Sequence, residues 1–269
     1  MIEFPPAKIN LGLRVIKRRT DGYHDLFTVF YPIPLCDSLE ILPSNEFRFF
    51  SYGISIPGKP EENLVVKAWQ VLHQLKKIPP VEIHLLKNIP MGAGLGGGSS
   101  DAAFTLQMLN TMFELGLAPD ELKEIALSLG SDCPFFLHSQ PCAATGRGEE
   151  LQPIRFSLQG KYLLLIKPDV HISTAEAYRN VHPEMHLHPA EILRQPIETW
   201  KEQLVNDFEE WALKAYPILK QIKIELYSAG ALYASMTGSG AAFYGIFEQE
   251  PQIPAPLKSD FTRVLRLPF

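Results

Sequence analysis

Pro90-Met-Gly-Ala-Gly-Leu-Gly-Gly-Gly-Ser-Ser-Asp-Ala-Ala103 is the stretch that decides the fold. It follows Val81–Lys87, whose apolar residues alternate as in a strand, and precedes apolar residues at helical spacing that end near Gly116. The glycines therefore lie on a predicted loop between a strand and a helix. Because glycine lacks a Cβ atom, the backbone there can approach a ligand closely, and amides at the start of a helix attract phosphate. Ser99 and Ser100 are expected to cap that helix, or to offer hydroxyls to phosphate or a bound cation.

Three other glycine-rich patterns fit this stretch less well. Gly92, Gly94 and Gly97 match the dinucleotide-binding fingerprint, but that fold places an acidic residue after a second strand about 20 residues further on. Asp120 and Glu121 have about that offset, yet they begin a predicted helix. The Walker pattern fails because no Gly-Lys-Ser/Thr follows, and a flexible linker would not carry a strand before it and an amphipathic helix after it. A phosphate-binding loop of another lineage is the better prediction.

Composition limits the classes of function. The chain has 269 residues, enough for one large domain or two, and 46% of them are hydrophobic, enough for a core. The formal net charge of −5 gives no support to a nucleic-acid partner, and no apolar stretch approaches a membrane span. Cys36, Cys133 and Cys142 are odd in number and form no Cys-x-x-Cys pair, and the chain begins with no signal-peptide pattern. We therefore expect a cytoplasmic protein with reduced thiols and with neither a nucleic-acid nor a membrane partner.

Two polar residues lie within the first predicted strand, Pro6–Val15. Lys8 and Asn10 fall on the face opposite the alternating apolar residues, and a solvated strand face is the simple interpretation. The sequence Asp21-Gly-Tyr-His24 then predicts a hairpin turn, with an aromatic residue and an imidazole directly after it.

The Pro-x-Gly-x-Gly-Leu-Gly-Gly-Gly-Ser-Ser loop, Pro6-Ala-Lys-Ile-Asn-Leu11 and Asp21-Gly-Tyr-His24 occur in one order that resembles the GHMP small-molecule kinases over nearly the whole chain. The resemblance implies an α+β, two-domain GHMP kinase fold. The amino-terminal domain, like ribosomal protein S5 domain 2, would span residues 1–158, and a ferredoxin-like carboxyl-terminal domain would span 159–269. ATP and substrate would meet in the cleft between them.

The same resemblance implies the chemistry. ATP and Mg²⁺ would serve as cofactors, and the acceptor would be the alcohol of a small molecule. The Asp-Gly-Tyr-His element points to a branch that phosphorylates a cytidine diphosphate ester of a polyol in non-mevalonate isoprenoid biosynthesis. The oligomeric state stays open. Two alternatives also stay open: a GHMP kinase for another alcohol, such as homoserine or mevalonate, and a noncatalytic nucleotide-binding module, against which the intact Lys8 and Asp132 argue.

Site residues follow from the resemblance, residue by residue. Asp132, which alone would be an ordinary residue of a turn from a helix to a strand, would accept the proton of the acceptor hydroxyl, and Lys8 would orient it. The predicted ATP-binding residues are Pro90, Met91, Gly92, Ala93, Gly94, Leu95, Gly96, Gly97, Gly98, Ser99, Ser100, Asn63 and Lys87. The predicted substrate-binding residues are Asn10, Tyr23, His24, Thr174 and Tyr178, with the two tyrosines stacking on the cytosine ring. The segment Thr237–Ala241 would lie beside the phosphates, and no metal ligand is assigned.

Periodicity and capping patterns predict the remaining elements. They are a helix from Asn63, which would cap it, a helix at Pro119–Gly130, a strand at Lys161–Lys167, a helix at Ala175–Asn180 capped by Ser173 or Thr174, helices near Ile197–Tyr216 and Pro217–Tyr227, two strands joined by a glycine turn within Ala234–Phe247, and a strand at Phe261–Leu267. The resemblance implies, in addition, a glycine-containing hairpin at Ala143–Leu151 that ends the first domain. His182, His186 and His188 lack acidic or cysteine partners at ligand spacing, so a metal site is not predicted there.

Overall fold

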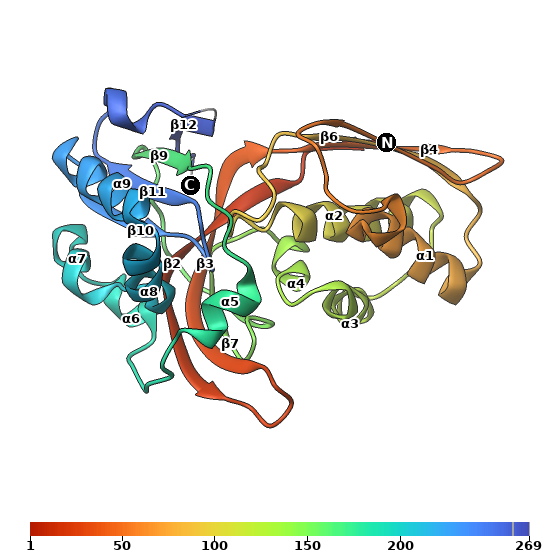
Figure 1. The fold of residues 1–269 in the computed structure, drawn as a ribbon. Helices are drawn as coiled ribbons and strands as arrows, with labels where there is room; N and C mark the ends of the chain where they lie inside the picture. Colours follow the sequence, from red (N-terminus) through yellow and green to blue (C-terminus); the bar gives the residue numbers. More distant parts are fainter. Residues whose placement is uncertain (260, 269) are drawn as a thin grey trace. The chain divides into compact units, whose positions relative to one another are not determined.

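The structure, a computed structural model, describes residues 1–259 and 261–268. The chain divides into two compact units, neither of which is continuous in sequence (Figure 1). Unit 1 contains Met1–Ala7, Leu35–Met91 and Gly96–Ser139, and unit 2 contains Lys8–Pro34, Gly92–Leu95 and the chain from Gln140 onward. The predicted domains 1–158 and 159–269 are continuous, so they do not coincide with these units, and that boundary stays a prediction. The mixed helix and sheet content confirms the α+β class.

Unit 1 is a sheet with helices on one face. Its elements are β1 (Ile2–Glu3), β4 (Ser38–Pro43), β5 (Arg48–Gly53), α1 (Leu64–Lys76), β6 (Val81–Lys87), α2 (Gly97–Met112), α3 (Pro119–Leu129) and α4 (Cys133–Phe136), with a short 3₁₀ turn at Pro60–Glu62. The strand order is β1-β4-β6-β5, antiparallel except between β5 and β6. Alternate residues of β6, such as Ile83 and Leu85, are buried against α1 and α2, which Figure 1 shows along the sheet. The period-2 prediction for this strand is confirmed.

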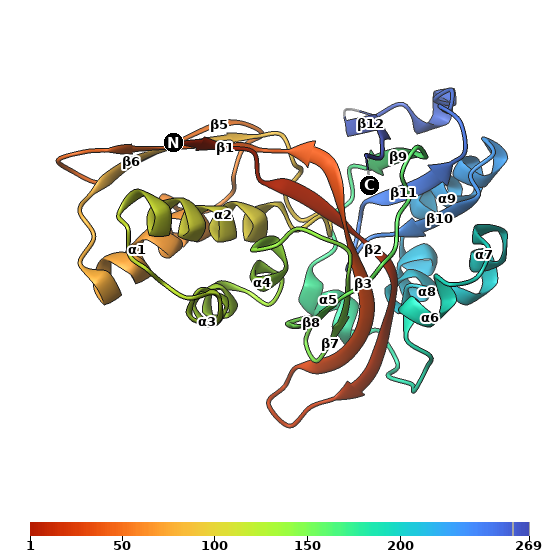
Figure 2. The same cartoon turned by 180° about the vertical axis from the view of Figure 1, so that it is seen from behind.

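Unit 2 contains two antiparallel sheets and the remaining helices, seen from behind in Figure 2. The long strands β2 (Pro6–Arg18) and β3 (His24–Cys36) lie almost wholly in this unit and form the sheet β2-β3-β7-β8 with β7 (Cys142–Thr145) and β8 (Glu150–Pro153). The second sheet has the order β10-β11-β9-β12. Its strands and the helices of the unit are β9 (Tyr162–Lys167), α5 (Thr174–Arg179), α6 (Pro189–Ile192), α7 (Trp200–Gln203), α8 (Asp207–Ala215), α9 (Pro217–Ser228), β10 (Tyr233–Met236), β11 (Phe243–Phe247) and β12 (Phe261–Arg266), with 3₁₀ turns at Ile197–Thr199 and Ala255–Leu257. Apolar residues of α8 and α9, among them Phe208, Ala212 and Leu226, pack in its core.

The structure confirms most predicted elements and corrects three. Helix α2 begins earlier than predicted, at Gly97, because Gly96 turns the chain with a φ of 72°, so Ser99 and Ser100 lie inside the first turn instead of capping it. The segment after Asp132 is the short helix α4 and not the start of a strand, since Pro134 suits the first turn of a helix. The single helix predicted near Ile197–Tyr216 is split into α7 and α8.

Caps predicted from the sequence are found where the helix start was placed correctly. Asn63 precedes α1 and accepts a hydrogen bond from the Val65 amide at 2.9 Å. Ser173 precedes α5 and accepts one from the Glu176 amide at 3.2 Å. Within residues 1–259 and 261–268, none of the helices has the length and apolar character needed to cross a bilayer.

Candidate active site

The glycine-rich loop follows β6, and its glycines allow its backbone conformation. Gly92, Gly94 and Gly96 have φ values of 59°, 74° and 72°, in the left-handed region that residues with a Cβ rarely adopt. A Cβ atom built on Gly94 lies 2.0 Å from the carbonyl oxygen of Thr237, and one built on Gly97 lies 2.8 Å from Cγ2 of Ile89. Gly98 differs, because the nearest atom to its built Cβ is Cδ1 of Leu64, at 3.9 Å. At Gly94 and Gly97 a side chain would therefore collide with neighbouring protein atoms, whereas at Gly98 a Cβ would make only an ordinary van der Waals contact.

The loop leads into the amino-terminal turn of α2, where backbone amides and hydroxyls gather. The first helical hydrogen bond runs from the Ser100 amide to the Gly96 carbonyl oxygen at 2.9 Å. The backbone amides that precede Ser100 in this turn therefore donate no helical hydrogen bond. The hydroxyl of Ser100 is fully buried and has no hydrogen-bond partner among the described residues. The amino-terminal end of a helix favours anions, and a buried hydroxyl without a hydrogen-bond partner can bond to a ligand oxygen. The start of α2 therefore suits an oxygen-rich ligand.

Lys8 and Asn10 are buried, so the interpretation of a solvated strand face is wrong. Their exposed fractions are 3% and 2%, and Lys8 Nζ donates to Asn10 Oδ1 at 2.6 Å and to the Gly94 carbonyl oxygen at 3.0 Å. Asn10 Nδ2 donates to the Thr28 hydroxyl at 2.9 Å. The ammonium group is also 5.0 Å from the ring centre of Phe30. A cation taken out of water needs such partners, and here it is held against the glycine loop.

Thr237 joins the strand β2 to the same part of the loop. Its hydroxyl accepts a hydrogen bond from the Asn10 amide at 3.1 Å and donates to the Gly94 carbonyl oxygen at 3.0 Å. The Ala242 amide, on the far side of the β10–β11 turn, donates to the Ala93 carbonyl oxygen at 3.4 Å. Thr237–Ala241 therefore lies beside the glycine loop in unit 2, and its closeness to the ATP phosphates stays a prediction.

Asp132 lies in unit 1 at the start of α4 and is partly exposed. Its neighbour Cys133 is buried near the first turn of α2: a Cβ built on Gly130 lies 3.3 Å from the Cys133 sulfur and 3.8 Å from the Ser99 hydroxyl. Burial raises the pKa of the Cys133 thiol to about 12, partly opposed by a hydrogen bond with Ser99. The thiol is therefore neutral near pH 7.

Lys87 is placed beneath the loop and not at its surface. It is 1% exposed and forms ion pairs with Asp37 and with Asp101, the latter at 2.7 Å. Asp37 also accepts the amides of Asn88 and Ile89 at 2.6 and 2.9 Å, which fixes the chain just before Pro90. Burial raises the pKa of Asp101 to about 7, against the opposing effect of the Lys87 charge. Direct contact of Asn63 or Lys87 with nucleotide stays a prediction.

The predicted substrate residues of unit 2 form two groups. His24 and Tyr178 stack at 4.7 Å between ring centres, and burial lowers the pKa of His24, helped by the charge of Arg18. Thr174, one turn before Tyr178 on α5, has its hydroxyl 3.2 Å from that of Ser239. Tyr23 is apart from this stack: it is 52% exposed and lies under the Arg147 guanidinium, 4.6 Å from its ring centre. Tyr178 is thus stacked on His24, and Tyr23 lies outside this pair.

The three histidines at 182–188 have separate surroundings. His188 accepts a hydrogen bond from the Ala190 amide at 3.0 Å, capping α6, and contacts the Ala144 carbonyl oxygen at 3.2 Å. His186 lies 3.8 Å from Glu184. Across the described ranges 1–259 and 261–268, no group of three or more His, Cys, Asp or Glu side chains is arranged to hold a metal ion.

Sequence reasoning missed several polar residues around these groups, namely Thr28, Asp37, Asp101, Arg147, His171, Asn206 and Glu209. His171 lies beside the loop, since its ring is 3.4 Å from a Cβ built on Gly92. Asp37 and Asp101 are 50 and 14 residues from Lys87 in the chain, so no spacing pattern links them. Asn206-Asp-Phe-Glu209 did offer a signal, because Asn and Asp are common at helix starts and rarer inside the helix predicted there.

Comparison with known proteins agrees with this arrangement. Models of the GHMP kinases N terminal domain and the GHMP kinases C terminal domain match residues 63–140 and 190–258. The chain is 51% identical to a 4-diphosphocytidyl-2-C-methyl-D-erythritol kinase of Bacteroides thetaiotaomicron, covering 94% of each chain.

Solved structures give the same picture of the fold. A 4-(cytidine 5'-diphospho)-2C-methyl-D-erythritol kinase is 34% identical with a TM-score of 0.79, covering 91% of this chain and 90% of that one. A mevalonate kinase of Methanococcus jannaschii, 17% identical over 92% and 90% of the two chains, has a TM-score of 0.66 and shares the fold alone.

Proposed function

We propose residue roles from the premise that this chain belongs to the GHMP kinase family, among relatives that are 4-diphosphocytidyl-2-C-methyl-D-erythritol kinases. The chain is an ATP-dependent kinase of isoprenoid biosynthesis. We infer that its acceptor is the 2-hydroxyl of 4-diphosphocytidyl-2-C-methyl-D-erythritol and that it works in the cytoplasm, where its three free cysteines stay reduced. This activity excludes the alternative of a noncatalytic nucleotide-binding module.

The glycine loop binds the ATP phosphates through backbone amides. Phosphoryl transfer asks the protein mainly to position the phosphates and to offset their charge. The positive φ values of Gly92, Gly94 and Gly96 shape the loop, and the start of α2 adds the positive end of a helix of 16 residues. Gly98, with open space around its Cα, lets phosphate oxygens approach the first turn.

Mg²⁺ fits the oxygen-rich start of α2. The Ser100 hydroxyl, buried and unsatisfied among the described residues, is the protein group that would hold it. Mg²⁺ bound there would neutralise part of the charge of the nucleotide phosphates.

Asp132 accepts the proton and Lys8 supplies positive charge. As the acceptor oxygen bonds to the γ-phosphorus, the bond from phosphorus to the leaving oxygen of ADP breaks and the hydroxyl proton passes to Asp132. A free aspartate has a pKa of about 3.9, so it serves as a base only because the proton is lost while the new bond forms. The buried Lys8 ammonium, hydrogen-bonded to the Gly94 carbonyl oxygen, is the observation that carries this proposal, because a cation is kept out of water beside the loop.

The stacked pair His24 and Tyr178 binds the cytosine end of the acceptor. Their planes differ by 19°, so the rings are stacked face to face and the outer face of His24 is the surface on which a base can stack. Burial keeps His24 neutral near pH 7, and a neutral imidazole can pair with the polar edge of the base. Asn10 and Thr174 contribute hydrogen bonds to the polyol, and Tyr23 covers the outer edge of the base.

An acceptor panel tests this function. ADP release is measured with ATP and each of 4-diphosphocytidyl-2-C-methyl-D-erythritol, methylerythritol phosphate, homoserine and mevalonate. We expect strong preference for the cytidylylated alcohol. Equal use of methylerythritol phosphate would refute the cytosine site, and preference for homoserine or mevalonate would assign the chain to another branch of the family.

A further inference from the structure

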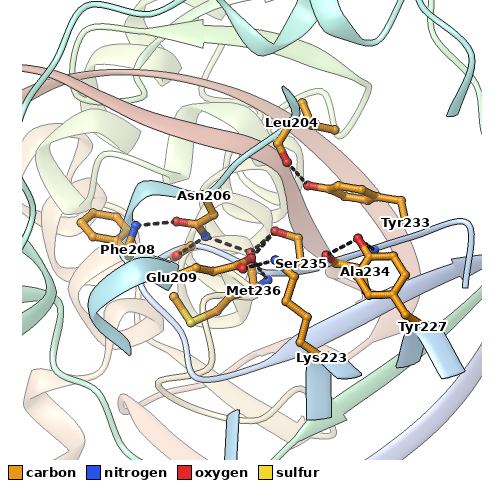
Figure 3. Close-up of polar contacts among 11 residues, drawn as sticks. Leu204, Asn206, Phe208, Glu209, Lys223, Tyr227, Tyr233, Ala234, Ser235 and Met236 are labelled. Carbon is orange, nitrogen blue, oxygen red and sulfur yellow. Dashed lines mark hydrogen bonds and ion pairs between the residues drawn. The ribbon is translucent and has the colours of Figure 1, made fainter. Parts of the chain in front are cut away.

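The segment Leu204–Glu209 follows α7 and includes the first turn of α8, and it binds the strands β2 and β10; we call it the bridging segment. Its Val205 carbonyl oxygen accepts the Leu13 amide of β2 at 2.9 Å. Asp207 accepts the Val15 amide at 2.8 Å and pairs with Arg14 at 2.7 Å. Figure 3 shows that other groups of the bridging segment point toward β10 and the turn after it. The bridging segment therefore holds the strand that carries Lys8 and Asn10.

Asn206 uses each end of its amide for a different purpose. Its Oδ1 accepts the Phe208 amide at 3.0 Å and caps α8. Its Nδ2 donates to the carbonyl oxygens of Met236 and Gly238, at 2.8 and 2.9 Å. The side chain is 1% exposed, so water does not replace these bonds. Two carbonyl oxygens facing one group require two donors, which an asparagine offers and an aspartate lacks.

Glu209 holds the residues just before that turn. Its Oε1 accepts the Ser235 hydroxyl at 2.6 Å and the Met236 amide at 2.7 Å, and its Oε2 pairs with Lys223. The side-chain carboxylate is buried, with the residue 4% exposed. Asn206 and Glu209 thus bond to the Ser235 hydroxyl and to the backbone of Met236 and Gly238 (Figure 3).

The turn held in this way touches the glycine loop backbone to backbone. A Cβ built on Gly94 meets the Thr237 carbonyl oxygen at 2.0 Å, and one built on Gly238 meets the Gly94 Cα at 3.0 Å. Packing this close transmits a displacement of Met236–Gly238 to Gly94, because no side chain lies between them to absorb it.

We propose that Asn206 is a positioning residue for ATP binding, which holds Met236–Gly238 and through it the Gly92–Leu95 part of the glycine loop. This inference rests on the proposed role of the loop in binding phosphate. The two hydrogen bonds that Asn206 Nδ2 donates, and not its cap on α8, are responsible for the effect on ATP binding.

The variant Asn206→Asp separates the two roles. Aspartate caps a helix as well as asparagine does, so α8 stays capped, while the second carboxylate oxygen faces two carbonyl oxygens. We expect the dissociation constant of a nonhydrolysable ATP analogue, measured by calorimetry, to rise about tenfold. Amide hydrogen exchange should speed up at Asn10 and Ala242, which bond to the turn and the loop, and stay slow at Phe208.

Asn110→Asp is the matched control, because Asn110 also bonds loop backbone, at the Leu117 amide 3.1 Å away, but at the far end of α2. It should leave nucleotide affinity within about twofold. If Asn206→Asp does not fold, Asn206→Ser, which caps without a charge, carries the same test. Unchanged affinity and unchanged exchange in a folded variant would overturn the proposal. If Gly98→Val weakens binding of the ATP analogue and Asn206→Asp does not, the positioning role of Asn206 is refuted and the role of the loop stands. If neither variant weakens binding, the role of the loop in binding phosphate is refuted.

Discussion

Replacing Gly98 with valine tests whether the helix start is a phosphate site without disturbing the fold. The nearest atom to a Cβ at this position is Cδ1 of Leu64 at 3.9 Å, an ordinary van der Waals contact. Gly98 lies in the first turn of α2, and valine is a somewhat better helix former than glycine, by a few tenths of a kcal/mol. The free energy of unfolding should therefore change by less than about 0.5 kcal/mol.

The effect on ATP should be much larger than the effect on stability. A hydrogen bond to a charged group contributes about 1.5–3 kcal/mol, so loss of even one amide–phosphate bond weakens binding about tenfold or more. Steady-state kinetics with varied ATP, together with thermal unfolding, measure both quantities on one preparation. An unchanged KM for ATP in a folded Gly98→Val variant would show that phosphate does not occupy this turn.

Gly97→Val is the comparison variant. A Cβ at this position lies 2.8 Å from Cγ2 and 3.1 Å from Cβ of Ile89, so valine overpacks the interior. Overpacking typically costs about 1–3 kcal/mol, and the unfolding temperature should fall. If Gly97→Val and Gly98→Val lowered the unfolding temperature equally, the room around Gly98 would not explain the effect of Gly98→Val on ATP binding.

Three further outcomes follow from the site. Asp132→Asn should lower kcat by about 10²–10⁴ and leave the affinity for ATP near that of the wild type; turnover within a few-fold of the wild type would reduce Asp132 to a turn residue. Tyr178→Ala should raise the KM for the cytidylylated acceptor more than Tyr23→Ala does, since Tyr178 is stacked on His24 and Tyr23 is half exposed; the reverse order, measured by the same ADP assay, would contradict the stacking surface. Because burial raises the pKa of Asp101 to about 7, folded protein binds this proton more tightly than unfolded protein does. The free energy of unfolding should therefore fall as pH rises from about 4 to 7, and urea titrations of Asp101→Asn should show a shallower fall; an identical slope would exclude Asp101 as its source.

Local patterns predicted the elements whose stability is decided locally. Strand β6 was predicted within its observed bounds because alternate apolar residues face one buried side. Helix α3 was predicted because Pro119 begins it and Gly130 ends it. The glycine spacing located the loop, and the resemblance to a family supplied Lys8 and Asp132.

Partners distant in the chain were beyond sequence reasoning. The ion pairs of Lys87 could not be predicted, because nothing near it in sequence shows that Asp37 and Asp101 surround its ammonium group. Lys8 and Asn10 looked solvated because alternation marks two faces of a strand but does not say that both are covered. The cap that Asn206 provides for α8 is a local signal, but its hydrogen bonds to the carbonyl oxygens of Met236 and Gly238, 30 and 32 residues later, could not be predicted from the sequence.

The discontinuous units also set an order of events during synthesis on the ribosome. Every residue of unit 1 has been made once Ser139 is added, so that unit can assemble while the rest is still untranslated. The amino-terminal strand β2, although made first, depends on Val205 and Asp207 for bonds to Leu13 and Val15. The Asn10 amide must also wait for the Thr237 hydroxyl, so one of the earliest-made residues of the site is among the last to gain its final hydrogen bonds.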